Sequence, residues 1–184
     1  MKNNKRVICL IIIGLFAFNS MTFGKSQDSC SNIITNRIVT VNLLLPGFNY
    51  EKRLLNTSSL KIYTACLPMS RFSSSSGLTL SLVQDFGVQF RYYYNLKDRM
   101  ALGRNTTKNS LNYFGLSPVL SLPYKSGQSM SFSAQAVWGL QRSYNRWLLN
   151  LEFGIATFFK NNNSNETVYP VLNFSFGYIL FNQK

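Results

Sequence analysis

Hydrophobic and polar residues alternate strictly along residues 167–181, TVYPVLNFSFGYILF. The even positions carry large apolar side chains such as Leu172 and Phe174, whereas the odd positions include Asn173 and Ser175. A period of two sends successive side chains to opposite faces, so this segment is predicted to be a β-strand with one apolar and one small, polar face. The alternation continues well beyond the roughly 5–6 residues of a typical soluble strand. That length favours a lipid-facing strand of an outer-membrane β-barrel.

Three preceding segments alternate in the same way, at residues 111–122, 131–141 and 147–156. Their apolar faces carry mainly Leu, Phe and Trp, and their other faces carry mainly Gly, Ser, Asn and Gln. Small and polar side chains suit a narrow barrel interior, and the aromatic residues gather near the strand ends, as in interfacial girdles. The predicted fold class is therefore all-β: a transmembrane, up-and-down antiparallel β-barrel of about eight strands.

The N-terminal half contains further strands. We expect one strand over residues 38–54, with a bulge at Pro46-Gly47 where the apolar face changes to Phe48 and Tyr50. A tight turn at residues 56–58 and a strand over residues 59–67 follow.

A flexible connection is expected at residues 71–77, RFSSSSG, and the alternation then keeps the same parity over residues 78–96. The second stretch fits either one very long strand or two strands joined at residues 85–87. The even strand count of membrane barrels favours the split.

Residues 95–110, NLKDRMALGRNTTKNS, are the only long stretch without strand character. If both chain ends lie in the periplasm, residues 143–145 form a short periplasmic turn and residues 160–167 a longer outer loop, as is usual for these barrels. The same orientation places residues 95–110 in the periplasm, where they are longer than this rule expects.

The N-terminus has the pattern of a secretory signal peptide: a basic start, a short apolar run over residues 7–18, and small residues up to Ser26. The apolar run is shorter than the about 20 residues of a spanning helix, although an N-terminal membrane anchor is the alternative. Cleavage after Gly24 or Ser26 fits the sequence. The expected organisation is a signal peptide at 1–26, a polar lead at 27–37 and the barrel at 38–184, located in the bacterial outer membrane.

Composition supports a membrane barrel. The chain is 46% hydrophobic and 15% aromatic but only 14% charged, against about 25% charged residues in soluble domains. The net charge is +13, and removal of residues 1–26 leaves +9. Basic proteins often bind nucleic acid, but export makes lipid headgroups and lipopolysaccharide phosphates the expected partners, with other envelope proteins as further candidates. Lys125 and Lys160 in the expected outer loops suit such anions, and solubility alone also accounts for them.

Two stretches resemble small outer-membrane β-barrel proteins of the Bacteroidetes kind. Residues 44–54, LLPGFNYEKRL, are similar to the first hairpin of such proteins. Residues 91–113, RYYYNLKDRMALGRNTTKNSLNY, are similar to a signature of the same group, with an aromatic strand end followed by Gly-Arg-Asn-Thr and Asn-Tyr. The resemblance covers under a quarter of the chain. It implies an uncharacterised barrel family and transfers no activity or catalytic residue. Residues 92–94 are expected to belong to an interfacial aromatic band.

The chain lacks residues that several common kinds of catalytic and metal-binding sites require. The chain has no histidine, which serves as the base in Ser-His hydrolases and as a common zinc ligand. Its acidic residues form no evident pair: Asp28, Glu51, Asp85, Asp98, Glu152 and Glu166. We therefore expect no catalytic, cofactor-binding or metal-binding residues and no enzyme. The expected role is structural or interactive: envelope integrity, or lipopolysaccharide or partner binding through the loops. The alternatives are a small pore or transport accessory, and then a lipid-modifying enzyme. About eight strands enclose a filled interior, whereas open porins use about 16–18.

Parity also predicts a polar cluster in the barrel interior. Arg91 lies between the outward positions Phe90 and Tyr92, and Glu152 lies in the same way on its own strand. Both charges would be near mid-depth, where an unpaired charge is unfavourable, so we expect them to pair. The neighbours expected to complete this cluster by hydrogen bonding are Gln89, Gln135, Asn150 and Asn173.

Two cysteines remain after the expected cleavage, Cys30 and Cys66. An oxidising periplasm allows a disulfide between them. Cys30 precedes the first expected strand and Cys66 ends the second, so both are expected at the same rim of the barrel. The sequence leaves open whether the two thiols meet.

Overall fold

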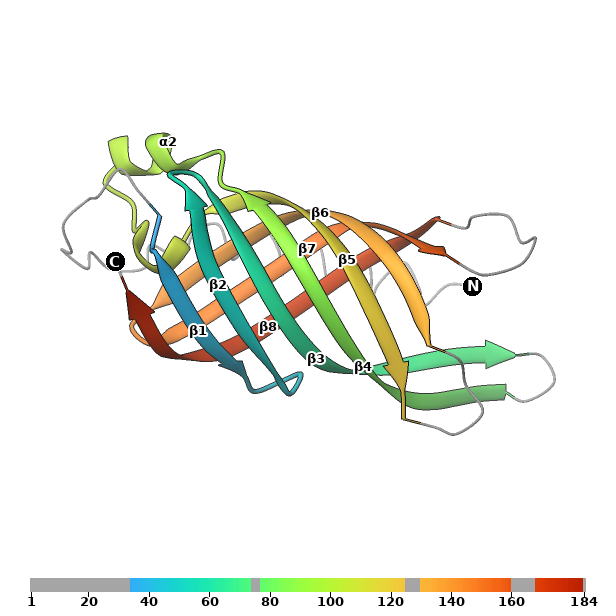
Figure 1. The fold of residues 1–184 in the computed structure, drawn as a ribbon. Helices are drawn as coiled ribbons and strands as arrows, with labels where there is room; N and C mark the ends of the chain where they lie inside the picture. Colours follow the sequence, from blue (N-terminus) through green and yellow to red (C-terminus); the bar gives the residue numbers. More distant parts are fainter. Residues whose placement is uncertain (1–33, 74–76, 125–129, 160–167, 184) are drawn as a thin grey trace, which may run out of the picture.

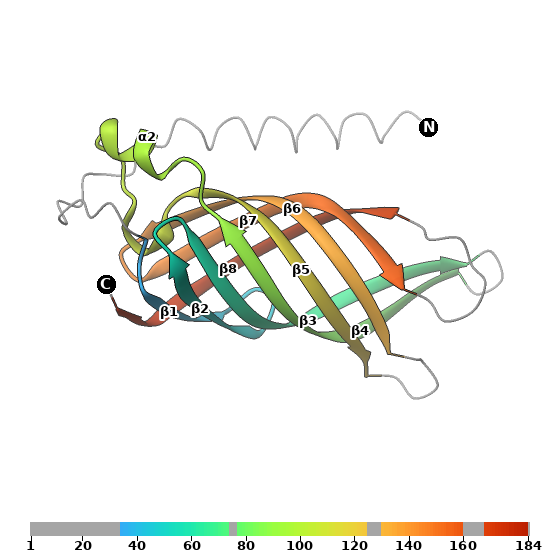
Figure 2. The ribbon, with the colours of Figure 1, turned by 45° about the horizontal axis from the view of Figure 1, so that its top comes forward.

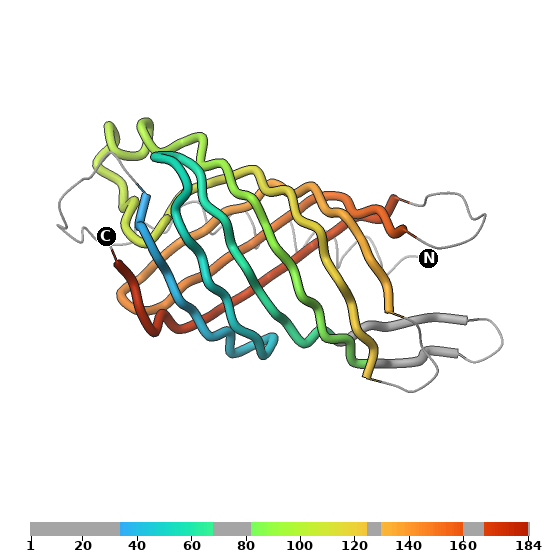
Figure 3. The backbone as a smooth tube through the Cα atoms, viewed as in Figure 1, coloured from blue at the N-terminus to red at the C-terminus, as the bar shows by residue number. Residues whose placement is uncertain are grey.

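Eight antiparallel strands form a closed sheet in which each strand pairs with the next and β8 pairs with β1 (Figure 1). The computed structural model describes residues 34–73, 77–124, 130–159 and 168–183. The strands are β1 (Arg37–Asn42), β2 (Gly47–Leu55), β3 (Ser58–Ser73), β4 (Gly77–Tyr92), β5 (Asn112–Pro123), β6 (Ser131–Tyr144), β7 (Trp147–Phe159) and β8 (Val168–Gln183). They run obliquely to the long axis of the barrel (Figure 3). The predicted all-β, up-and-down antiparallel architecture is confirmed.

The predicted number of strands is confirmed, but two segments are divided differently. One predicted strand is two strands in the structure, and two predicted strands are one. The expected strand over residues 38–54 is two strands, β1 and β2, joined by a turn at residues 43–46. Pro46 therefore belongs to a turn and not to a bulge. Proline has no N–H for a sheet, and its carbonyl instead accepts a hydrogen bond from the N–H of Cys66 at 2.9 Å.

The expected break at residues 85–87 is also wrong, because β4 is continuous and pairs with β3 along its length. Gly87 lies opposite Tyr63, and a Cβ at Gly87 would lie 2.2 Å from Cζ of that tyrosine. The glycine thus makes room for a ring that crosses it inside the barrel. Asp85 is buried on the same interior face. The polar residues that suggested a turn are interior positions of one long strand.

The predicted strand at residues 59–67 is also longer in the structure, where β3 continues to Ser73. It therefore takes in part of the expected flexible connection, whose centre lies outside the described residues. The four C-terminal segments agree with β5 to β8 to within a few residues at their ends.

Side chains alternate between the interior and the outer face around the whole sheet. On β5 the pattern is strict, with Phe114 and Leu116 exposed while Tyr113 and Ser117 are buried. Among the described side chains, the outward positions are mostly apolar on every strand, and their exposure is high, for example 62% for Leu116. The closed sheet therefore has a polar interior and an apolar exterior, the reverse of a soluble barrel.

The two ends of the barrel differ. Residues 93–111 connect β4 to β5 through α2 (Leu96–Ala101) and the short 3-10 helix η2 (Thr107–Asn109); we call this segment the cap. The cap lies at the end that also holds the C-terminus (Figure 2), and we call this the cap end. The opposite end, where β3, β5 and β7 finish, is called the loop end.

The cap is folded against the barrel and not extended away from it. A buried apolar cluster joins it to the strands and the N-terminal approach: Ile34, Tyr93, Leu96, Leu111 and Tyr113, with Met100 packed on it. The expected long connection without strand character is thus an ordered closure of one barrel end. Among the described residues, no helix combines the length and the apolar composition needed to cross a membrane.

Candidate functional site

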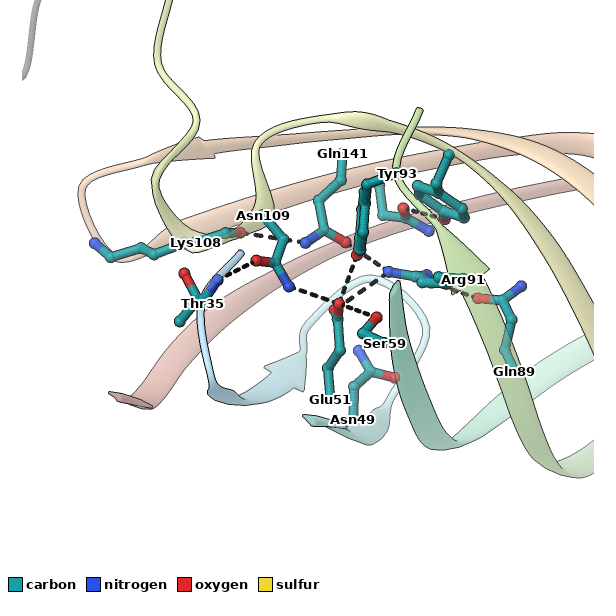
Figure 4. A network of polar contacts seen from close by, with 12 residues as sticks. Thr35, Asn49, Glu51, Ser59, Gln89, Arg91, Tyr93, Lys108, Asn109 and Gln141 are labelled. Atoms are coloured by element: carbon teal, nitrogen blue, oxygen red, sulfur yellow. Dashed lines mark hydrogen bonds and ion pairs between the residues drawn. The ribbon is translucent and has the colours of Figure 1, made fainter. Parts of the chain in front are cut away.

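A charged cluster lies in the barrel interior near the cap end, with Arg91 of β4 at its centre (Figure 4). Arg91 is completely buried. Its guanidinium contacts two carboxylates, with Nη2 at 3.0 Å from Glu152 Oε1 and Nη1 at 3.4 Å from Glu51 Oε2. Its Nε donates to Gln89 Oε1 at 2.6 Å and Nη1 donates to Gln141 Oε1 at 2.7 Å. One arginine therefore links β2, β4, β6 and β7 across the lumen.

Glu152 of β7 accepts hydrogen bonds from three neighbouring side chains in addition to Arg91. The Tyr113 hydroxyl donates to Oε1 at 2.6 Å, and the Asn150 amide donates to the same oxygen at 3.2 Å. The Asn173 amide of β8 donates to Oε2 at 3.0 Å. Both carboxylate oxygens are thus engaged, which offsets the unfavourable burial of the charge.

Glu51 of β2 is held in a similar way, and one of its partners comes from the cap. Ser59 Oγ donates to Oε1 at 2.6 Å, and the Tyr93 hydroxyl donates to the same oxygen. The side-chain amide of Asn109, in η2, also donates to Oε1, at 2.7 Å. Glu51 therefore connects the charged interior to the element that closes the barrel.

Lys61 of β3 balances the charges of the cluster. It is only 8% exposed and interacts electrostatically with Arg91, Glu51 and Glu152. Its Nζ lies 5.1 Å from the centroid of the Tyr63 ring, a cation–π contact. Arg91 lies 4.1 Å from the centroid of the Tyr113 ring. Two cations and two anions thus give the cluster a net charge of zero.

The space around the cluster is small. The cavity lined by Glu51, Lys61, Arg91 and Gln141 has a volume of about 10 Å³, roughly the space of one water molecule. Within the described residues, no group of three or more His, Cys, Asp or Glu side chains is arranged to hold a metal ion. The chemical property that this geometry supports is a rigid, electrically neutral plug that joins strands on all sides of the lumen.

The structure brings together five of the six side chains expected in the interior cluster. Arg91, Glu152, Gln89, Asn150 and Asn173 form one hydrogen-bonded network. The sixth residue, Gln135, lies nearer the loop end, and its buried Oε1 has no hydrogen-bond partner among the described residues. Gln135 shares the correct face of β6 but not the correct depth, because parity fixes only the face.

Sequence reasoning missed several members of the cluster: Glu51, Lys61, Tyr93, Tyr113, Asn109 and Gln141. Glu51 has a signal, since outward positions at Phe48 and Tyr50 require it to point inward. Tyr93 has the same parity signal. The expected place of Tyr93 in an aromatic interfacial band is wrong, because this residue is fully buried, whereas Tyr92 and Tyr94 are exposed. Asn109 has no signal, because cap geometry places it.

The expectation that Cys66 lies at the rim where the N-terminal lead joins the barrel is wrong. Cys66 lies opposite Gln84 inside β3, level with the turn at residues 43–46. Residues 34–37 approach the barrel at the cap end, so Cys66 is not at the rim where the N-terminal lead joins. Cys66 is half-buried and forms no disulfide within the part of the chain that the structure describes. Cys30, the predicted signal peptide, Lys125 and Lys160 lie outside the described residues.

The cap is fastened to the interior by Asn109. Its Oδ1 accepts a hydrogen bond from the Thr35 N–H at 2.8 Å, while its amide donates to Glu51. Asn109 has a φ of 55°, and Lys108 before it has a φ of 52°. This left-handed conformation is unusual for residues other than glycine, although asparagine adopts it more readily than most. One buried side chain therefore joins the N-terminal approach, the cap and the ion cluster.

We expect Asn109→Ala to lower the free energy of unfolding by about 2–3 kcal/mol. It leaves the Thr35 N–H and one Glu51 oxygen without this partner and puts alanine in the left-handed region. Denaturant unfolding of the refolded barrel, followed by tryptophan fluorescence, measures the loss. Asn109→Gly is the control, since it removes the same hydrogen bonds without the backbone penalty and should lose about 1 kcal/mol less. An unchanged midpoint for Asn109→Ala would contradict the fastening role.

Aromatic side chains border the apolar outer face at both ends. Near the cap end, Trp147 stacks on Phe176 with centroids 5.0 Å apart, and it meets the Tyr178 ring edge-on with centroids 5.3 Å apart. Near the loop end, Phe132 and Phe159 lie 5.6 Å apart. From Trp147 to Phe159 along β7, a rise of about 3.3 Å per residue gives about 40 Å. At a strand tilt of about 40° this corresponds to a band about 30 Å high.

Comparison of the chain with protein-family models, with curated proteins and with solved structures gave no match. The resemblance to small outer-membrane barrels of the Bacteroidetes kind therefore stays a prediction.

Proposed function

We propose that this protein is an outer-membrane β-barrel with a non-catalytic, structural or interaction role in the cell envelope. The observation that carries the proposal is the belt of large apolar side chains exposed around the closed sheet. The largest apolar patch on a typical soluble monomer covers about 300–600 Å². A belt on every strand, bordered by aromatic residues at both ends, fits a surface whose solvent is lipid.

The interior supports a structural role over a conducting one. A spanning sheet must satisfy its own backbone groups, and closure of the sheet does so. Inside, the cluster around Arg91 links four strands with hydrogen bonds between buried side chains. Within the described residues, each carboxylate oxygen of Glu51 and Glu152 already contacts at least one donor, which favours a structural role for both side chains. The barrel would act through its outer surface and its two ends.

We place the cap end in the periplasm and the loop end at the cell surface. The predicted signal peptide delivers the chain from the periplasmic side, and both ends of the barrel sequence lie at the cap end. In this orientation the ordered cap closes the periplasmic mouth. The loop-end termini of β3, β5 and β7 would then face the cell surface, where lipopolysaccharide and envelope partners are available.

We expect the mature chain to fractionate with the outer membrane and to show heat-modifiable mobility on gels. A closed sheet resists detergent at low temperature and migrates differently from the boiled chain. The measurement is membrane fractionation followed by electrophoresis of boiled and unboiled samples. A soluble periplasmic protein exported by the same signal peptide serves as the fractionation control. Recovery of the mature chain from the periplasm without detergent would rule out the proposed location.

A further inference from the structure

An apolar groove of about 480 Å³ crosses the outer face of β4, β5, β6 and β7. The register aligns Phe114, Trp138 and Phe153 in one row across neighbouring strands. The next row toward the loop end contains Ala136, whose small side chain leaves the hollow between bulkier neighbours. The groove is thus a depression in the outer apolar belt and not part of the lumen.

Three arginines gather at the cap end of the same face. On β6, the outward positions beyond Trp138 are Leu140 and then Arg142. Arg142 donates to Asn112 Oδ1 at 2.8 Å and to the Gln141 carbonyl at 2.7 Å. The positive charges of Arg99 and Arg104 in the cap act on Arg142. No ion pair within 4 Å involves any of the three in the part of the chain that the structure describes.

Hydrogen bonds hold this part of the cap against β6. Arg99 Nη2 donates to the Asn105 carbonyl at 3.1 Å, and the Asn105 amide donates to the Ser143 carbonyl at 3.1 Å. Burial, together with the nearby charge of Arg104, lowers the pKa of Arg99. The buried Nε of Arg99 has no hydrogen-bond partner among the described residues. Neighbouring guanidinium groups that form no ion pair within the described residues indicate a site for an anion, and guanidinium geometry suits phosphate.

The distance between groove and arginines matches one lipid leaflet. Ala136 and Arg142 are six positions apart on β6, which corresponds to about 20 Å along the strand. At a tilt of about 40° the difference in depth is about 15 Å, close to half of a hydrocarbon core of about 30 Å. In an embedded barrel, the arginines would lie at the headgroups of the leaflet on the cap side while the groove faces its acyl chains.

We propose that the groove and the three arginines together bind one anionic phospholipid from the leaflet at the cap end. Its phosphate contacts Arg99, Arg104 and Arg142, and one acyl chain lies in the groove over Ala136. The inference rests on the proposed membrane location. A free phosphate ion would use the arginines but not the groove, and a neutral lipid would use the groove but not the arginines.

Quenching of Trp138 fluorescence by brominated lipids tests the site. Trp138 and Trp147 are the two tryptophans of the chain, so Trp147→Phe leaves Trp138 as the reporter at the groove. The protein is refolded into phosphatidylcholine vesicles that contain a minor fraction of either brominated phosphatidylglycerol or brominated phosphatidylcholine. We expect the anionic lipid to be enriched at Trp138 roughly tenfold over the neutral one, since each basic side chain near the headgroups favours anionic lipid severalfold.

Two variants separate the contributions of charge and groove. Combined Arg99→Gln, Arg104→Gln and Arg142→Gln substitution should bring the enrichment close to onefold, and Ala136→Leu should lower it by filling the groove. A matched charge control removes three exposed cations elsewhere at the same end: Arg37→Gln, Lys52→Gln and Arg146→Gln. Ala134→Leu is the control for Ala136→Leu, since Ala134 is the next outward position on β6 and does not line the groove. Both controls should retain the enrichment.

Four results would overturn the lipid site. Equal quenching by the two lipids, or an equal loss of enrichment in the charge control, would leave only general surface charge. Displacement of phosphatidylglycerol by inorganic phosphate alone would identify the ion as the ligand. If neither brominated lipid quenches Trp138, the membrane location and the lipid site are overturned together. This result is distinguishable from the others, because a barrel in the bilayer is quenched by the neutral lipid even without a specific site.

Discussion

Arg91→Met is expected to lower the free energy of unfolding by about 3–5 kcal/mol, the range for breaking a buried ion pair by removing one partner. Arg91 contacts Glu51 and Glu152 at once, at 3.4 and 3.0 Å. Its removal leaves two buried carboxylates with only Lys61 as a neighbouring cation among the described residues. Equilibrium denaturant unfolding in lipid vesicles measures the change. Arg146→Met is the control, since this exposed arginine makes no described ion pair and should change stability by less than about 0.5 kcal/mol.

A double-mutant cycle tests whether Arg91 and Glu152 act as a pair. Glu152→Leu alone leaves two cations facing one anion and should also destabilise the barrel. The double variant Arg91→Met with Glu152→Leu retains Lys61 and Glu51, so the cluster remains neutral. We therefore expect the double variant to lose less than the sum of the single losses, by about 1–3 kcal/mol. Strictly additive losses would mean that the two side chains do not meet in solution, contrary to the geometry of the cluster.

Strand alternation predicts the C-terminal half of the fold well because most inward positions there are small or polar. In β5 to β8 the strand ends coincide with polar segments, as at Asn145 between β6 and β7. Asn145 has a φ of 53°, which suits a tight hairpin turn. Where polar turn residues and the two-residue alternation indicate the same boundary, the ends of a strand can be predicted from sequence to within a few residues.

In the N-terminal half, the turn-forming residues and the alternation of apolar positions indicate different strand boundaries. The turn between β1 and β2 occupies residues 43–46, Leu-Leu-Leu-Pro, and lacks the polar residues that usually indicate a turn. Within β4, Asp85 and Gly87 look like turn residues but occupy interior positions, Asp85 as a buried polar group and Gly87 beneath Tyr63. The unbroken parity of residues 78–94 is the more reliable signal of the two.

The same alternation predicts only part of the candidate site. Parity correctly identifies an interior face but gives no depth, so it groups Gln135 with residues that lie nearer the cap end. It also gives no information on segments without alternation. The cap supplies Asn109 to Glu51 through a left-handed turn at Lys108 and Asn109. Nothing in the residue pattern of 95–110 encodes that turn, because its conformation depends on the tertiary contacts of the cap.

Leu172→Arg is the substitution that most directly separates a membrane barrel from a soluble one. Leu172 is 63% exposed on the outer face of β8 and lies opposite Phe153 near the middle of β7. In water, exchanging an exposed leucine for arginine changes stability by less than about 0.5 kcal/mol. At the middle of a bilayer, an outward arginine on a β-barrel costs about 2–4 kcal/mol. We expect the larger loss when the free energy of unfolding is measured in lipid vesicles.

Leu102→Arg is the matched control. Leu102 is 65% exposed, almost the same as Leu172, but it lies in the cap just after α2 and outside the spanning strands. The same exchange there should leave the free energy of unfolding within about 0.5 kcal/mol of the parent protein. The depth of the substituted position, and not its exposure or residue type, then accounts for the difference. Similar small effects at both positions would mean that water and not lipid surrounds the apolar belt, and the proposed membrane location would have to be abandoned.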